Sequence, residues 1–143
     1  MRAPPAACLA LILLTACADV PSDETPSGAL RLFVDAMERS DGDPEALRDA
    51  YALMAAPSRR ALQERAHLAA SLGGREFQPW EMLVRSRFRR SFAFRDRAMR
   101  EVIDGDHATV TVRSEDGQRS AQVPLERENG RWRVLVEIPP ARE

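Results

Sequence analysis

The apolar residues of this chain change from a helical period to a period of two, and that change constrains its fold most strongly. Between Ser27 and Leu72 they recur three and four positions apart, which is the spacing of one face of an α-helix. From Ala108 to Ile138 they alternate with polar residues, as in strands with one buried face. Trp132 alternates in this way with Val134 and Val136, so it is expected to be a core residue. Helices are therefore expected first and strands afterwards.

Three helices are expected in the first half of the chain. Ser27 is predicted to cap the first helix, which ends at Ser40-Asp41-Gly42. The dipeptide Asp43-Pro44 supplies a cap and a first-turn proline for the second helix. Pro57-Ser58 opens the third helix, and Gly73-Gly74 ends it.

Turn sequences divide the second half into short strands. The turns are expected at 104–106, 115–117 and 128–130, each with an acidic residue and a glycine. With a strand near 97–103, they predict a four-stranded antiparallel meander. Pro124 lacks an N–H group, so it should lie at an edge or a bulge. Helices followed by an antiparallel sheet define an α+β fold, with the helices packed on one face.

Three segments resemble the nuclear transport factor 2-like superfamily, in particular its small bacterial lipoproteins of unknown function. They are the amphipathic helix Ala29–Arg39, the strand "DGDHATVTV" and the hairpin "AQVPLERENGRWRVLVEI". The resemblance covers roughly Ser27 to Ile138 and implies a cystatin-like cone, in which one curved sheet surrounds helices. The superfamily contains isomerases, cyclases and dehydratases as well as binding and assembly modules, so the resemblance implies a fold more than an activity.

The first residues are typical of an export signal. Arg2 precedes an apolar run that ends at Leu14, too short for a membrane-spanning helix of ~20 residues. The sequence Leu14-Thr15-Ala16-Cys17 resembles the bacterial lipobox, in which the cysteine receives diacylglycerol and, after cleavage, a further acyl chain such as palmitate.

We therefore expect a signal peptide over residues 1–16 and lipid on Cys17. Residues 17–26 are expected to be a flexible tether, and residues 27–143 a single domain. The expected location is the cell envelope, with the protein held to a membrane by its N-terminal lipid. Ala18 follows the cysteine, where an aspartate would favour inner-membrane retention in enteric bacteria, so the outer membrane is favoured.

Composition excludes several kinds of site. The formal net charge is -1, which gives no general attraction to nucleic acid. The two cysteines are Cys8 and Cys17, so the mature domain has no disulfide, thiolate metal site or cysteine nucleophile. The two histidines, His67 and His107, lack a matching carboxylate pattern, and we expect neither metal nor cofactor.

The residues that enzymes of this superfamily often use are scarce here. Tyr51 lies on the apolar stripe of the second helix, where a core role is expected, although it is also a candidate for lining a pocket. His107 lies beside a turn, and Asp104 and Asp106 flank the glycine of that turn. No catalytic residue is assigned, and an enzyme is the less favoured interpretation.

An arginine-rich strip is the most unusual local feature. Arginine alternates from Arg85 to Arg89, so an extended chain places three guanidinium groups on one side. Such groups bind phosphates or anionic sugars, although the ordinary interpretation is a solvated strip paired with acids. Trp80 lies just before the strip, in a short helical turn, and is a candidate for the rim of a pocket. The candidate binding residues are Arg85, Arg87, Arg89, Arg90, Trp80 and Tyr51.

Three functions follow from these observations. The favoured one is a membrane-anchored, non-catalytic domain that binds or assembles with an envelope protein or a small ligand. The second is a small-pocket isomerase or cyclase, which requires a deep cone with buried, facing catalytic groups. The third is an adaptor for anionic lipid or glycan through the strip Arg85–Arg100. A cone filled by apolar side chains favours the first.

Overall fold

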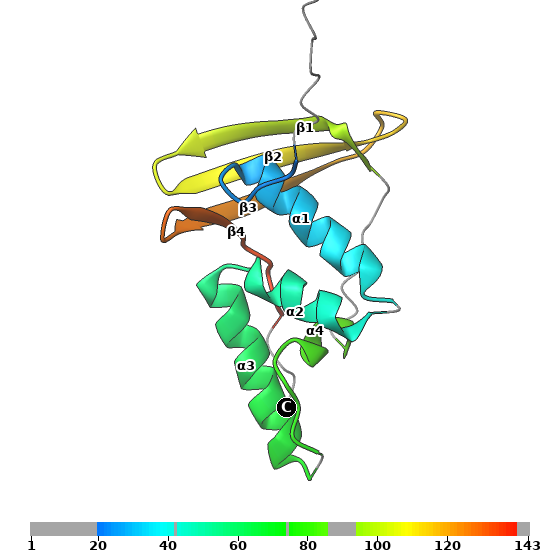
Figure 1. Ribbon diagram of the computed structural model, residues 1–143, viewed down its shortest axis with the longest axis vertical. Helices are drawn as coiled ribbons and strands as arrows, with labels where there is room; N and C mark the ends of the chain where they lie inside the picture. The colour runs from blue at the N-terminus through cyan, green and yellow to red at the C-terminus, as the bar shows by residue number, and fades with distance from the viewer. Residues whose placement is uncertain (1–19, 42, 74, 86–93, 140–143) are drawn as a thin grey trace, which may run out of the picture.

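The computed structural model describes residues 20–41, 43–73, 75–85 and 94–139, with the backbone alone for 84, 85 and 94–98. Helices come first and strands afterwards, which confirms the α+β class (Figure 1). The elements are α1 (Pro26–Arg39), α2 (Pro44–Ala52), α3 (Ala56–Ser71), α4 (Glu81–Arg85), β1 (Phe94–Asp104), β2 (His107–Ser114), β3 (Ser120–Glu128) and β4 (Arg131–Val134).

The four strands form one antiparallel sheet in the order β1-β2-β3-β4, which confirms the predicted meander. Asn129 and Gly130 have φ values of 51° and 78°, the left-handed region that a tight hairpin turn requires. On β2 the side chains alternate as the period of two predicts: Ala108, Val110 and Val112 are buried, and the threonines between them are half-buried.

The first helix begins earlier than predicted. Thr25 is its cap, because its side-chain oxygen accepts a hydrogen bond from the Gly28 N–H, and Pro26 is the first helical residue. Ser27 is therefore not the cap, and Pro26, expected at the end of a tether, is buried. The second helix begins as predicted, with Asp43 as its cap and Pro44 in its first turn.

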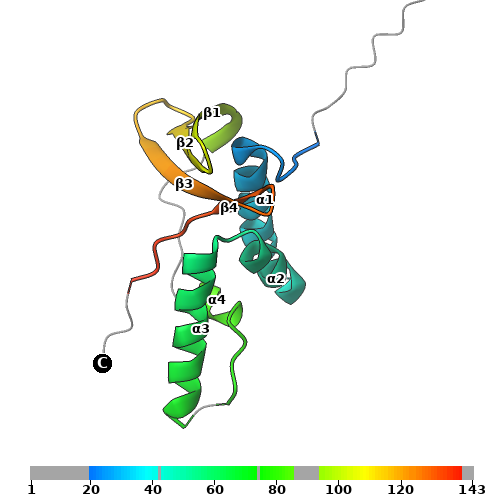
Figure 2. The ribbon, with the colours of Figure 1, turned by 90° about the vertical axis from the view of Figure 1, so that its left-hand side faces the viewer.

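Helix α1 is the helix that lies along the sheet, in contact with β1, β2 and β4 (Figure 2). Helix α2 packs on α1, and α4 lies between α2 and α3. Helix α3 points away from the sheet, as Figure 1 shows. The expectation that all the helices cover the sheet is thus met by α1 and not by α3.

The N-terminal end of α3 joins it to the sheet. The backbone N–H of Ala56 and the guanidinium of Arg59 both donate to the carboxylate of Glu128 at the end of β3. The buried hydroxyl of Ser58 donates to the carbonyl oxygen of Val136 and accepts from its N–H, both at 2.8 Å. The opposite end of α3 has little cover, and Leu72, the residue that follows its last turn, is 80% exposed.

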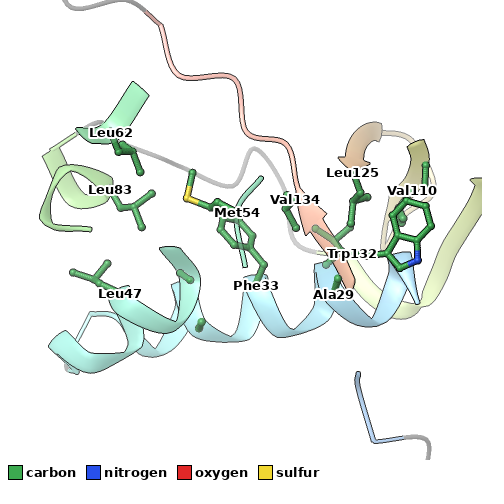
Figure 3. Packing of buried hydrophobic residues seen from close by; sticks show 14 of the residues in the cluster. Ala29, Phe33, Leu47, Met54, Leu62, Leu83, Val110, Leu125, Trp132 and Val134 are labelled. Atoms are coloured by element: carbon green, nitrogen blue, oxygen red, sulfur yellow. The ribbon is translucent and has the colours of Figure 1, made fainter. Parts of the chain in front are cut away.

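The core lies between α1 and the sheet and continues between α2, α3 and α4 (Figure 3). Phe33 of α1 and Trp132 of β4 are 2% and 1% exposed, which confirms the prediction that Trp132 is a core residue. Met54 connects the two regions, because it is fully buried where the α2–α3 connection meets β4. The largest buried side chains are Trp132, Phe33, Met54, Leu62, Leu83 and Leu125.

Strand β4 is shorter than its alternating sequence predicts. It ends at Val134, whose N–H donates to the Leu53 carbonyl oxygen and whose carbonyl oxygen accepts from the Ala55 N–H. The next carbonyl on β3, that of Pro124, accepts from the Leu135 N–H as the chain leaves the sheet. The N–H and C=O groups of one strand residue point to the same side of the strand. The nitrogen of Pro124, which has no hydrogen to donate, therefore points to the side where β4 has already ended. Its predicted position at an edge is confirmed.

Candidate functional site

The predicted site residues fall into two groups. Cys17, Arg87, Arg89 and Arg90 lie outside the described residues. Arg85 is the last residue of α4, and its side chain is not described. Tyr51 and Trp80 are both described, and they lie together on the helical part of the domain.

Tyr51 and Trp80 make an edge-to-face ring contact. Their ring centroids are 6.2 Å apart and the ring planes are inclined by 66°. Both side chains are half-buried against the core. Arg48, one turn before Tyr51 on α2, places its guanidinium carbon 4.9 Å from the centre of the Trp80 ring. The same guanidinium forms an ion pair with Glu45 at 2.9 Å.

A second arginine stacks on an aromatic ring nearby in the sequence. The guanidinium carbon of Arg75 lies 4.4 Å from the centre of the Phe77 ring. Arg75 also pairs with Glu81 at 2.6 Å, and a Glu81 oxygen accepts the Gln78 N–H at 2.7 Å. These bonds hold the segment before α4 in place. We call the set Arg48, Tyr51, Arg75, Phe77 and Trp80 the aromatic–arginine surface.

A shallow hollow of about 250 Å³ lies between α3 and the segment that carries Phe77. His67 is among its lining residues and is exposed. Apolar and polar side chains alternate around it: Gln63, Ala66, His67, Ala70, Glu76, Phe77, Gln78 and Pro79. The hollow is on the outside of the domain, so a ligand here would contact amide and aromatic groups on an open surface.

In the described part of the chain, the core is formed by apolar side chains. Among the described residues, the buried polar side chains are those of Ser58 and Ser114, and both make hydrogen bonds within the protein. Figure 3 shows Met54, Phe33 and Trp132 occupying the space between α1, the sheet and the α2–α3 connection. The facing, buried Asp/Tyr or Asp/His pair that an enzyme of the cone type needs is not found in the described part of the chain.

The acidic groups with perturbed pKa values have structural partners. Burial alone would raise the pKa of Asp23, but a 2.7 Å bond from Arg133 and the charge of Arg131 outweigh it and lower that pKa. Burial alone would likewise raise the pKa of Glu128, but hydrogen bonds from the Ala56 N–H and the Arg59 guanidinium outweigh it and lower that pKa. These shifts favour the charged carboxylate, whereas a carboxyl that acts as a general acid needs a raised pKa.

The turn between β2 and β3 holds the third such acid. The Ser114 hydroxyl and the Gln118 N–H both donate to Asp116 and lower its pKa. The sequence placed Asp116 and Glu128 in predicted turns and Asp23 in the expected tether, without identifying their partners. Their roles depend on partners distant in the chain or on the exact turn geometry, and neither leaves a periodic pattern.

His107, the second of the two histidines, is exposed at the start of β2 and lies opposite Glu126 of β3 in the sheet. The described part of the chain contains no group of three or more His, Cys, Asp or Glu side chains that could hold a metal ion. None of the described helices is long and apolar enough to span a membrane.

Comparisons of the chain with family models, with curated proteins and with solved structures give no match.

Proposed function

We propose that this protein is a lipid-anchored lipoprotein of the bacterial cell envelope whose domain binds a partner protein or ligand without catalysing a reaction. The observation that carries the proposal is the apolar core of the described residues, in which the side chains of Met54, Leu62 and Trp132 are at most 1% exposed. An isomerase or cyclase would need a buried acid or base there. The described acids whose pKa values are shifted, Asp23, Asp116 and Glu128, are instead held in the charged form by hydrogen bonds.

The anchor rests on the sequence. The complete lipobox at Leu14–Cys17 supports lipid on Cys17, and more than one acyl chain makes a stable attachment. The outer membrane is the proposed location because Ala18 follows the cysteine. Metabolic labelling with a radioactive fatty acid tests the anchor. We expect label and membrane association for the unsubstituted chain and loss of both for Cys17→Ala, with Cys8→Ala as the control. Labelled Cys17→Ala in the membrane pellet would contradict it.

The same proposal includes the fold family. The α1 helix lying along an antiparallel meander supports a nuclear transport factor 2-like, cystatin-like cone, in agreement with the resemblance of the "DGDHATVTV" and Trp132-bearing strands.

The aromatic–arginine surface is the proposed binding surface. Half-buried aromatic rings and stacked arginines are the residue types most enriched where proteins bind partners. A photo-reactive amino acid at Gln78, which is exposed beside this surface, tests the assignment in the full chain in membranes. The matched control is the same substitution at Gln122, exposed on β3. We expect a cross-linked product from Gln78 that is lost with Arg48→Gln and Arg75→Gln. Equal products from both positions would contradict the assignment.

The arginine strip carries a second candidate function, an adaptor for anionic lipid or glycan. The supporting observation is the run of seven arginines between Arg85 and Arg100, of which Arg100 is described and exposed. Each basic residue near an anionic surface contributes ~1 kcal/mol. Co-sedimentation with anionic and neutral vesicles over a salt series tests it. We expect weak, salt-sensitive binding to anionic vesicles.

Two matched double variants distinguish binding by the arginine strip from an effect of the net charge of the domain. Arg87→Gln with Arg89→Gln should weaken the binding, whereas Arg60→Gln with Arg113→Gln, both exposed elsewhere, should not. Equal binding to both vesicle types, or equal effects of the two double variants, would remove this candidate.

A further inference from the structure

The two edges of the sheet are treated differently by the rest of the chain. On β4 the Trp132 N–H donates to the Asp23 carbonyl oxygen at 2.8 Å. Further along the same edge, the backbone groups of Val134 bond to Leu53 and Ala55. The protein therefore satisfies its β4 edge with its own backbone, and that edge is closed to another strand.

The other edge is β1, an 11-residue strand. Within the described part of the chain, the backbone of Met99–Asp104 pairs with β2 and with no other segment. An edge strand of this kind presents N–H and C=O groups that another strand can pair with. Val102 and Ile103 on this edge are 61% and 47% exposed, although they project to opposite faces of the sheet. Exposed apolar side chains on an open strand edge favour pairing of that edge with a second strand, because pairing removes them from water.

The charges beside Val102 select a register. In an antiparallel pair related by a two-fold axis, residues directly opposite one another share a face. When the two-fold axis passes through Val102, the two copies of Val102 lie opposite one another. Arg100 of each copy then lies opposite Asp104 of the other copy. All three residues are exposed on the outer face. Centring on Arg100 or Glu101 would oppose like charges, which destabilises a sheet.

We propose that two copies of this chain pair through their β1 edges, antiparallel and centred on Val102, to make one continuous sheet. Reciprocal Arg100–Asp104 ion pairs flank the central valines. The contact is short, so the dimer is weak and depends on concentration.

A disulfide test reports the register directly. The full chain with Cys8→Ser and Cys17→Ser has no thiol, so a cysteine introduced at Val102 is the sole one. Directly opposite Cβ atoms lie about 4.5–5.5 Å apart, which a small shift makes compatible with a disulfide. We expect mild oxidation to convert Val102→Cys largely to a covalent dimer. Thr111→Cys, on the same face one strand inward, should remain monomeric. A monomeric Val102→Cys, or equal dimer from both, would overturn the proposal.

Charge reversal tests the flanking pairs in the thiol-free chain. Arg100→Asp or Asp104→Arg alone opposes like charges and should weaken dimerisation, measured by sedimentation equilibrium, about tenfold. The double variant restores both pairs and should recover the original dimer. Circular dichroism of each variant separates loss of pairing from loss of folding. Folded single variants with unchanged dimerisation, or a double variant that stays weak, would overturn the assignment of these pairs.

Discussion

The backbone N–H of Trp132 donates a hydrogen bond to the carbonyl oxygen of Asp23, and the Asp23 carboxylate accepts hydrogen bonds from Arg131 and Arg133 on either side of that tryptophan. Asp23, which precedes the first helix, is thus joined to the last strand by both its backbone and its side chain. The segment from Asp23 to Thr25 is part of the folded domain.

Replacement of Trp132 by alanine should lower the free energy of unfolding by ~3–5 kcal/mol, because its ring is 1% exposed in the core. Urea unfolding of a chain that begins at Ala18 measures the change. Leu72→Ala is the control, since Leu72 is 80% exposed and should change stability by ~0.5 kcal/mol or less. Similar effects from the two variants would contradict the placement of Trp132.

Asp23 should contribute stability that is lost in acid. Its folded-state pKa is lowered below the ordinary value of 3.8, so the contribution is complete well above pH 3.8 and declines as the pH falls through the folded pKa. Asp23→Asn should therefore make unfolding less sensitive to pH below about 4, as measured by thermal melts across a pH series. The exposed Asp41→Asn is the control. An acid limb that Asp23→Asn leaves unchanged would show that the Arg133 bond does not form in solution.

Replacement of Ser58 by alanine should cost ~1–3 kcal/mol, because the N–H and C=O groups of Val136 both lose their partner at a buried site. Hydrogen exchange should show faster exchange of the Val136 amide, with smaller changes in β2. Ser71, whose hydroxyl bonds within α3 at an exposed position, offers the control Ser71→Ala. Val136 protection that survives in Ser58→Ala would be inconsistent with the hydrogen bond.

Gly28 should not tolerate alanine, although it lies within a helix where alanine is normally favourable. A Cβ atom there would overlap the carbonyl oxygen of Ser22 and lie 2.7 Å from the Thr25 side-chain oxygen. We expect Gly28→Ala to displace the segment before α1 and to increase its cleavage by protease. Gly117→Ala, where nothing lies near the added atom, separates crowding from the left-handed strain that position carries. An unchanged cleavage rate in Gly28→Ala would contradict the close approach.

The order of helices and strands, the meander and the burial of Trp132 could be predicted because each depends on local periodicity. The early start of α1 was missed because both Thr25 and Ser27 can cap, and the Gly28 N–H selects the first of them. The end of β4 at Val134 depends on its bonds to the α2–α3 connection, which is remote in sequence. Long-range pairings of this kind carry no periodic pattern.

The candidate site was predictable only in part. The sequence singled out Tyr51 and Trp80 separately, and the structure brings their rings together. Arg48 was missed, because a single arginine on an exposed helix face is unremarkable until an aromatic ring from another segment lies beneath it. The exposure of Leu72 at the end of α3 could not be predicted, because the helical period identifies an apolar face without identifying what covers it.

The attachment of Asp23 to β4 also has a consequence for the proposed lipid anchor on Cys17. The chain between that lipid and the first residue attached to β4 runs from Cys17 to Asp23 and not to the end of the expected tether at Pro26. Six residues at ~3.3 Å each give a maximum of about 20 Å. An anchor of this length would hold the sheet end of the molecule close above the lipid headgroups. Helix α3 points away from the sheet (Figure 1), and its residues Gln63, Ala66, His67 and Ala70 line the hollow beside Phe77.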